Sequence, residues 1–138
     1  MNSANPTIDG FTITNGYNYG NVNDDDGGGG VYCYYGGVVL NCTISGNSAG
    51  GYWGGSGGGV FCYRGGTVEN CTISGNSASY GGGVFCRYGG TVQNCTISEN
   101  LANETGGGVY CYDGGTVQNC LISENLASDS GGGVLCRL

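Results

Sequence analysis

Charged side chains are scarce in this sequence, and basic ones are the scarcest. Only 9% of the 138 residues are charged, with three Lys or Arg in total, no His and a formal net charge of −7. Nucleic-acid binding needs a basic face that neutralises phosphates, so we expect no nucleic-acid partner. Apolar runs are only a few residues long, whereas a transmembrane helix needs about 20 apolar residues, so we expect no membrane span.

Helical periodicity is missing as well. Apolar residues do not recur at the 3.6-residue spacing of a helix face, and 33 residues are Gly, each of which costs about 1 kcal/mol in a helix interior. A helical repeat protein is therefore excluded. The Gly runs are not phosphate-binding loops either, because the Gly-Lys-Ser/Thr that such a loop requires follows none of them.

What the sequence does contain is one glycine-led segment that recurs along the chain. Its clearest copy is GGGVFCRYGGTVQNCTISEN, residues 81–100. The last copy is cut short by the end of the chain. The copies begin 29, 24, 25 and 25 residues apart, at Gly28, Gly57, Gly81, Gly106 and Gly131. A fixed period of this length indicates a solenoid or an array.

Within each copy the apolar residues alternate. In Val84-Phe85-Cys86-Arg87 and Cys95-Thr96-Ile97-Ser98 every second residue is small or aliphatic, which is the pattern of a strand. One copy is interpreted as three short strands, GVFCR, GTVQN and CTISE, joined by a Gly-Gly bend, an Asn bend and a variable loop. We therefore predict an all-β parallel β-helix of about five coils of 24–29 residues, with three strands per coil and no evident caps.

We expect a single domain over residues 1–138. The proposed divisions are a partial first coil with a long loop (1–27), four repeats (28–56, 57–80, 81–105 and 106–130) and a partial last coil (131–138). Alternation predicts inward columns of Val, Cys and Ile, one residue per coil. Two Asn columns mark corners, because Asn tolerates left-handed backbone and stacked Asn amides can form hydrogen-bonded ladders; these are Asn41, Asn70, Asn94 and Asn119, and Asn47, Asn76, Asn100 and Asn125.

Nine cysteines favour an oxidising, extracellular setting. Pairing within a coil, which we favour because both sulfurs then lie at one level of a narrow core, leaves Cys136 unpaired and joins Cys33–Cys42, Cys62–Cys71, Cys86–Cys95 and Cys111–Cys120. Pairing between coils leaves Cys33 unpaired and joins Cys42–Cys62, Cys71–Cys86, Cys95–Cys111 and Cys120–Cys136. The spacing does not choose between the two schemes. A third alternative is that all nine are free thiols acting as small buried hydrophobes.

The outward residues of the first strand of each copy form an aromatic stripe. A contiguous exposed apolar patch usually marks an interface, and Tyr-rich surfaces suit protein contacts and can stack on sugars. The alternative is that the stacked rings only stabilise the sheet. The predicted aromatic face consists of Tyr32, Tyr34, Phe61, Tyr63, Phe85, Tyr110 and Tyr112.

The segments DGFTITNG, GGGVYC, NCTISGNSA and GGGVFC resemble the right-handed parallel β-helix repeats of polymorphic outer-membrane proteins and autotransporter-like adhesins. The resemblance covers nearly the whole chain. It implies a right-handed coil, an extracellular or cell-surface location, and an adhesive or structural role.

Pectin-degrading enzymes also use β-helices, and their chemistry needs clustered carboxylates with Arg, Lys or His, or a bound calcium. Here the three cations are Arg64, Arg87 and Arg137, and the carboxylates are scattered singly apart from Asp24–Asp26. That acidic run is interpreted as a solvated loop, with a calcium site as the alternative. We therefore expect no enzyme, no catalytic residue, no cofactor and no metal site; a polysaccharide lyase or hydrolase is the least favoured function.

The two ends suggest the leading hypothesis, because each holds part of a coil and the parts are complementary. A head-to-tail contact that does not close gives an open filament. We therefore expect a self-assembling extracellular fibre subunit whose partner is itself, with end-to-end contacts at Ile8, Phe11, Ile13, Val134, Cys136 and Leu138. The alternative is a surface adhesin fragment that binds a glycan or a cell-surface protein through the aromatic stripe or the Trp53 loop.

Overall fold

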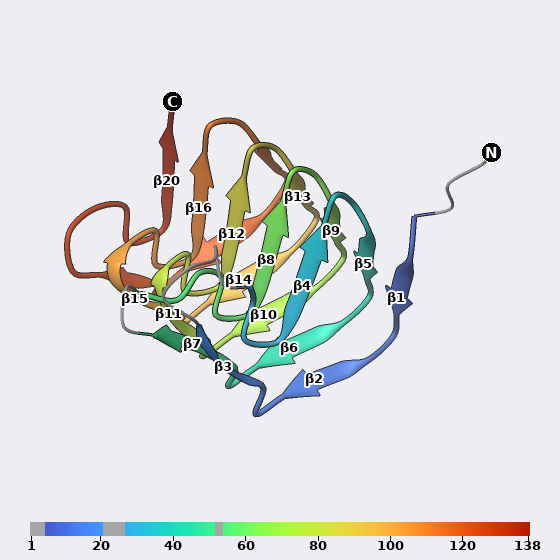
Figure 1. Ribbon diagram of the computed structural model, residues 1–138, viewed down its shortest axis with the longest axis horizontal. Helices are drawn as coiled ribbons and strands as arrows, with labels where there is room; N and C mark the ends of the chain where they lie inside the picture. Colours follow the sequence, from blue (N-terminus) through green and yellow to red (C-terminus); the bar gives the residue numbers. More distant parts are fainter. Residues whose placement is uncertain (1–4, 21–26, 52–53) are drawn as a thin grey trace.

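A computed structural model of the chain describes residues 5–20, 27–51 and 54–138. These residues form 20 short strands and no helix. The strands build four parallel sheets of five strands each, and the chain visits the sheets in turn as it winds (Figure 1). Four complete turns separate β1 from β17, and β18 to β20 make most of a fifth, so the expected five coils were slightly too many.

We call the four sheets A to D. Sheet A contains β1 (Thr7–Asp9), β5 (Val38–Leu40), β9 (Thr67–Glu69), β13 (Thr91–Gln93) and β17 (Thr116–Gln118). Sheet B contains β2 (Thr12–Thr14), β6 (Thr43–Ser45), β10 (Thr72–Ser74), β14 (Thr96–Ser98) and β18 (Leu121–Ser123). Sheet C contains β3 (Tyr17–Gly20), β7 (Ser48–Gly51), β11 (Ser77–Tyr80), β15 (Leu101–Thr105) and β19 (Leu126–Ala127). Sheet D contains β4 (Val31–Tyr34), β8 (Val60–Tyr63), β12 (Val84–Arg87), β16 (Val109–Tyr112) and β20 (Val134–Arg137).

Each coil has four strands, so the prediction of three was wrong. The additional strands form sheet C, which lies in the segment interpreted as a variable loop. There Ala78 pairs with Ala102, and Ala102 pairs with Ala127. A single small inward residue per coil, flanked by Ser and Gly, gives little apolar alternation. The backbone hydrogen bonds between coils still form, because they do not depend on apolar side chains.

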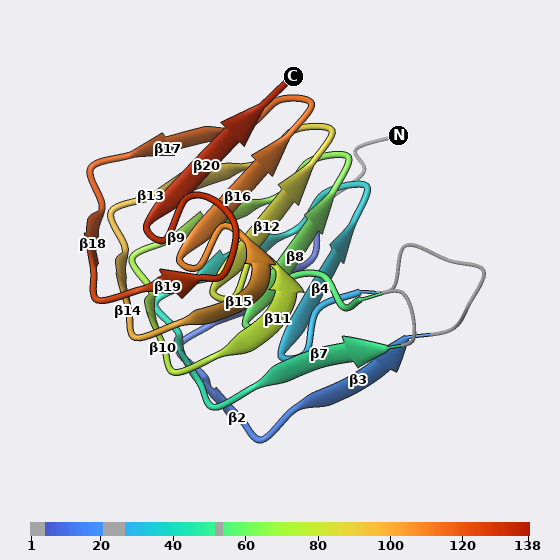
Figure 2. The same ribbon diagram turned by 90° about the vertical axis from the view of Figure 1, so that its left-hand side faces the viewer.

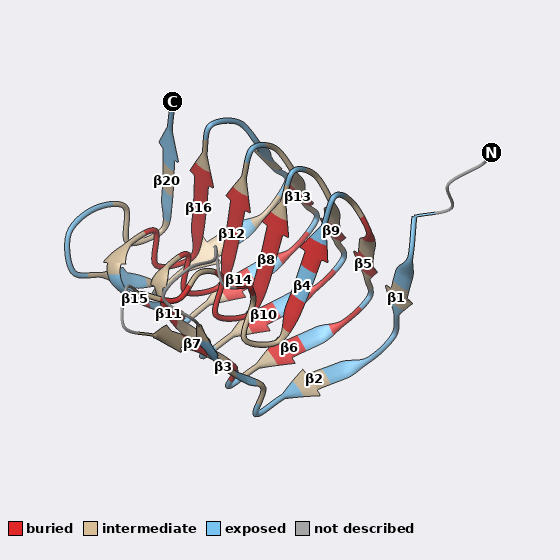
Figure 3. Cartoon of the chain, viewed as in Figure 1, coloured by how far each residue is buried: buried red, intermediate tan, exposed pale blue. Residues whose placement is uncertain are grey.

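The register confirms the inward columns. Val31 pairs with Val60, Cys33 with Cys62, and Ile44 with Ile73. The Val, Cys and Ile columns form one continuous core cluster, in which the members from the middle coils are nearly or fully buried. Burial concentrates in the central strands and decreases toward the first and last coils (Figure 3).

The corner between sheets A and B has the left-handed backbone expected of its Asn residues. Asn41, Asn70, Asn94 and Asn119 all have φ of 53–54°, a region in which Asn is enriched. The first coil has Gly10 there, with φ of 76°. This column therefore turns the chain, as predicted.

The second Asn column is buried and forms a hydrogen-bonded ladder. The side-chain amide of Asn76 donates to the Ile44 carbonyl at 2.9 Å and to Asn100 Oδ1 at 3.0 Å. Its own Oδ1 accepts from the backbone and the side-chain nitrogens of Asn47, both at 3.0 Å. No described buried side-chain nitrogen or oxygen lacks a partner, and an amide fits here because it both donates and accepts.

We predict that Asn76→Asp destabilises the chain by about 1–3 kcal/mol, because a carboxylate cannot donate to Ile44 and Asn100. Chemical denaturation followed by circular dichroism measures the loss. The matched control is Asn119→Asp, an exposed corner residue with φ of 53°, where Asp is also tolerated. Equal losses in the two variants would contradict a structural role for the buried ladder.

Candidate functional site: the Tyr–Arg ladder

Three of the seven residues of the predicted aromatic face do not lie at the surface. Phe61, Phe85 and Tyr110 are buried and stack with centroid separations of 5.0 and 4.8 Å. Alternation placed them correctly on the outer side of sheet D, but it could not show that the chain folds back over them. The segments that lead from β11 into β12, from β15 into β16 and from β19 into β20 lie across this side of the sheet (Figure 2).

Gly81 shows how the covering segment fits. It has φ of 62°, and a Cβ added to it would lie 2.8 Å from the Cβ of Phe85. Tyr80, Tyr63, Tyr112 and Leu135 pack around the buried rings. These three rings therefore form a second small core, as expected if stacked rings stabilise the sheet.

The aromatic residues that remain at the surface lie at the ends of the sheet D strands. Tyr34 is 60% exposed, while Tyr63 and Tyr112 are half-buried. The residue after each strand continues this surface and has left-handed backbone, with φ of 60° at Tyr35, 57° at Arg64 and 61° at Tyr88. Two Gly residues with positive φ then carry the chain into sheet A.

We call this surface the Tyr–Arg ladder. It consists of Tyr34, Tyr35, Tyr63, Arg64, Arg87, Tyr88 and Tyr112. Tyr32, the remaining member of the predicted face, is 42% exposed, stacks on Phe61 at 5.1 Å and has its ring 5.7 Å from that of Tyr34.

The guanidinium groups lie among the rings of the ladder. The Arg64 Cζ is 5.4, 5.5 and 5.7 Å from the ring centroids of Tyr35, Tyr63 and Tyr88. The Arg87 Cζ is 5.0 Å from Tyr88 and 5.9 Å from Tyr112, and its Nη2 donates to the Tyr88 hydroxyl at 3.3 Å. These are cation–π distances, so the rings hold the arginines in place at the surface.

Every cation of the chain belongs to this surface or extends it. Arg64 and Arg87 lie within the ladder. Arg137, on the last coil, pairs with Tyr112 of the coil before it. The rest of the chain carries the excess negative charge. Sequence reasoning counted the three arginines as too few for catalysis and placed Arg87 and Arg137 outward beside the aromatic stripe. It did not connect Arg64 with them, although the repeat puts Arg64 only one residue beyond its strand.

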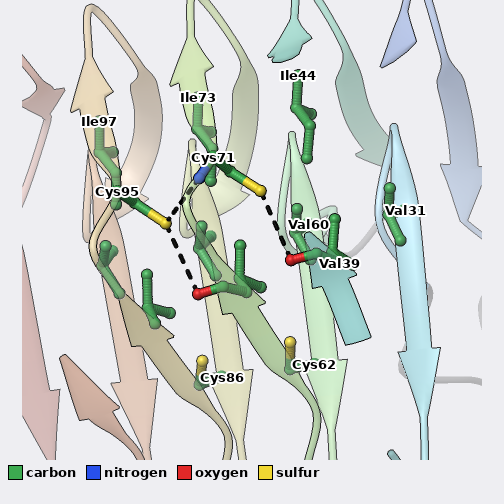
Figure 4. Close-up of a cluster of buried hydrophobic side chains, with 14 of the residues drawn as sticks. Val31, Val39, Ile44, Val60, Cys62, Cys71, Ile73, Cys86, Cys95 and Ile97 are labelled. Carbon is green, nitrogen blue, oxygen red and sulfur yellow. Dashed lines mark hydrogen bonds between the residues drawn. The ribbon is translucent and has the colours of Figure 1, made fainter. Parts of the chain in front are cut away.

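All nine cysteines lie among the described residues, and all are free thiols. The expected disulfides, including Cys33–Cys42 and Cys62–Cys71, are therefore absent from the structure. It has the free thiols of the third alternative, of which seven are buried, Cys120 is half-buried and Cys136 is exposed. Each sulfur instead stacks on the same residue of the neighbouring coil. In Figure 4, Cys62 and Cys86 lie on one side of the core, and Cys71 and Cys95 on the other.

Hydrogen bonds to backbone carbonyls satisfy one of the two thiol columns. The Sγ atoms of Cys71 and Cys95 are 3.6 Å from the carbonyls of Val39 and Val68. In the other column, the Cys33 thiol donates a hydrogen bond to the Cys62 sulfur, and this bond together with burial raises the pKa of Cys33 far above its ordinary value. Burial also raises the pKa of Cys136 at the end of that column. Cys33 and Cys136 are weak nucleophiles because they are held protonated in this way, whereas the hydrogen bonds that Cys62 and Cys71 accept lower the pKa of those two thiols, that of Cys71 to about 7.

The described acidic side chains do not form a cluster that could coordinate an ion. No group of three or more Cys, Asp or Glu in the described ranges is arranged to hold a metal. Asp24–Asp26 and Trp53, the acidic run and the proposed glycan-binding loop, lie outside the described residues. Glu104 is occupied in a different way, since the Tyr80 hydroxyl donates to its Oε2 at 2.5 Å.

The predicted end-to-end residues lie on the first and last coils. Ile8 and Ile13 pack partly buried against the core. Phe11 is 59% exposed, Val134 is 37% exposed, and Cys136 and Leu138 are exposed. A shallow hollow at the C-terminal end of the solenoid is lined by Cys111, Gly115, Cys136 and Leu138, among others.

Comparison with known families decides the classification. A family profile described as "Right handed beta helix region" matches residues 1–137. The chain belongs to this right-handed β-helix family. Neither the curated proteins nor the solved structures contain a match to the chain. The described residues form no helix, and therefore none that is long and apolar enough to cross a membrane.

Membership of the right-handed β-helix family establishes the fold and leaves the activity open. Domains of this family occur in enzymes such as pectate lyases and also in proteins that are not enzymes. The more specific resemblance to polymorphic outer-membrane proteins and adhesins is not established by the match.

We predict that a thiol reagent modifies Cys136 first, Cys120 more slowly, and the other seven cysteines only after unfolding, because those seven are buried. Counting modified thiols by mass spectrometry, without a reducing agent, gives the result. All nine should react in denaturant. A count below nine in denaturant would demonstrate disulfides and overturn the free-thiol assignment.

We also predict that Tyr80 titrates anomalously. Its hydrogen bond to Glu104, together with burial, raises its pKa from about 10 to about 12. The corresponding stability is fully present below pH about 10 and is lost as the pH rises through about 12. Difference titration of tyrosinate absorbance against Tyr80→Phe measures the pKa, and Glu104→Gln should lower it; a Tyr80 pKa unaffected by Glu104→Gln would contradict the assignment.

Proposed function

We propose that this chain is a structural, non-enzymatic β-helix subunit that joins end to end with further copies of itself. The observation that carries the proposal is the match between its two terminal coils. Each of the four sheets has one unpaired strand edge at either end of the described structure. An unpaired edge is a template for further strand pairing.

The residue types at the two edges continue the existing columns. Stacking would place Ile8 of one copy against Val117 of the next, as Ile8 already lies against Val39. It would likewise place Val31 against Val134 and extend the Ile13 column beyond Ile122. The new pairs would have the same chemistry as those inside the chain.

The exposed apolar side chains support the same contact. Phe11 lies on the first coil and Leu138 on the last, and both are exposed. Stacking is heterologous, since one end meets the opposite end, so it does not close on itself and would generate a filament. The single carboxylates and the arginines held among tyrosines support a role without catalysis.

An extracellular or cell-surface location remains part of the proposal, and it rests on the resemblance to adhesin repeats. The cysteine count no longer supports it, because the structure contains free thiols and does not depend on an oxidising compartment. The rival function is a surface adhesin fragment that binds glycan. This function is less favoured because Phe61, Phe85 and Tyr110 of the predicted aromatic face are buried and cannot contact a glycan.

The test uses one variant for each end. Ile8→Asp blocks the first coil, and Val117→Asp blocks the last, because stacking would bury an unpaired carboxylate in a core column. Sedimentation velocity and electron microscopy should show filaments for the wild type at rising concentration and monomers for either variant alone. An equimolar mixture should form dimers and nothing longer, since one intact end of each kind remains.

The matched controls are Thr7→Asp and Thr116→Asp, which add the same charge to the outward side of the same strands. Both should assemble like the wild type. A wild type that stays monomeric, or variants that still form filaments, would refute end-to-end assembly. Circular dichroism on every variant ensures that only folded protein is compared.

A further inference from the structure

The Tyr–Arg ladder is the most unusual surface of the molecule. The chain has a net charge of −7 and only three cations, yet all three occur at the ends of sheet D strands or one residue beyond. Tyrosine rings with 60%, 58% and 38% exposure, those of Tyr34, Tyr35 and Tyr88, lie beside them. The core does not require this concentration of rings and cations.

The local backbone adds a second observation. Tyr35, Arg64 and Tyr88 have left-handed φ, which is unusual for bulky side chains and is tolerated more easily by Gly or Asn. The corresponding position at the corner between sheets A and B is Asn in four coils and Gly in the first. Side chains kept at a backbone conformation that disfavours them are a recognised feature of binding surfaces.

We propose that the Tyr–Arg ladder binds an anionic polysaccharide that lies along the axis of the solenoid. Charge complementarity identifies the ligand. The ladder is cationic on an acidic chain, and a planar guanidinium binds a carboxylate or sulfate through paired hydrogen bonds. Exposed tyrosine rings offer flat apolar faces with a polar tip, on which sugar rings can stack.

The repeat of the ladder favours a polymer. Successive coils lie about 4.8 Å apart. Each of the first three coils presents ring or guanidinium groups at the same two positions, and the fourth coil presents Tyr112 at the first of them. A chain of charged sugars offers a matching succession of rings and anions. Several weak contacts along one chain then combine into a useful affinity.

A second copy of the chain is a poorer fit for this surface. The described acidic side chains are distributed over different columns. Glu69 lies on sheet A, Glu99 and Glu124 lie at the corner after sheet B, and Glu104 is hydrogen-bonded to Tyr80. No continuous acidic face among the described residues matches the ladder. Asp113, at the turn of the fourth coil, is the one acidic residue in the two ladder columns.

The experiment measures binding of defined heparin and alginate oligosaccharides by isothermal titration calorimetry, with dextran as the neutral comparison. The protein carries Ile8→Asp, so assembly through the ends does not interfere and the failure of one proposal leaves the other intact. We expect both anionic probes to bind, dextran not to bind, and the affinity to fall as salt is added.

Single variants then identify the residues. Arg64→Gln and Arg87→Gln should each weaken binding about tenfold, the effect of losing one charged hydrogen-bonding group. Tyr35→Ser should weaken binding without changing its salt dependence, whereas Tyr17→Ser, an equally exposed tyrosine on sheet C, should have no effect. Asp113→Asn should strengthen binding, because it removes the ladder's own negative charge.

Three results would overturn the proposal. The first is no binding of either anionic probe by folded protein. The second is binding that Arg64→Gln and Arg87→Gln leave unchanged. The third is equal binding of dextran and the anionic probes, which would indicate a neutral glycan surface. A change in self-association caused by the arginine variants, without polysaccharide binding, would assign the ladder to a lateral contact between copies.

Discussion

The fold depends on in-register stacking, which places each residue about 4.8 Å from its counterpart in the next coil. Every column must therefore tolerate a copy of itself. Val, Ile and Cys do so by packing, and buried Asn does so because its amide donates to one neighbour and accepts from the other. Two arginines stacked in one column would repel each other, and the arginines accordingly alternate with tyrosine: Arg87 lies between Tyr63 and Tyr112. The same constraint explains why a solenoid of this kind carries so few charges.

Much of the interior could be predicted because its signal is local. A strand has a period of two, and the 24–29-residue repeat aligns equivalent positions, so Val84, Cys86 and Ile97 were assigned inward correctly. Sheet C was missed because its inward residue is only Ala and its length varies between coils. Residues that are small and surrounded by Ser and Gly give no hydropathy pattern, although their backbones pair as well as any others.

The errors on the outer side of sheet D and in the core have a different origin. Alternation tells which side of a sheet a residue occupies, but it does not tell what covers that side; Phe85 points outward and is still buried under the segment containing Gly81. The cysteines raise a similar problem of geometry. Stacking gives each thiol a neighbour in the next coil, so Cys33 interacts with Cys62 and not with its own coil partner. The composition alone contained neither fact.

The two proposals reinforce each other through the same stacking rule. At a junction between copies, Arg137 of one chain would lie beside Tyr34 of the next, because β20 would pair with β4 in the register already found between β16 and β20. The Tyr and Arg order of the ladder would thus continue without two arginines in contact. Each added copy would lengthen the polysaccharide surface, and affinity for a long anionic chain would rise steeply with filament length through multivalency. Assembly and binding would then be coupled thermodynamically, since a polymer ligand that spans a junction stabilises it.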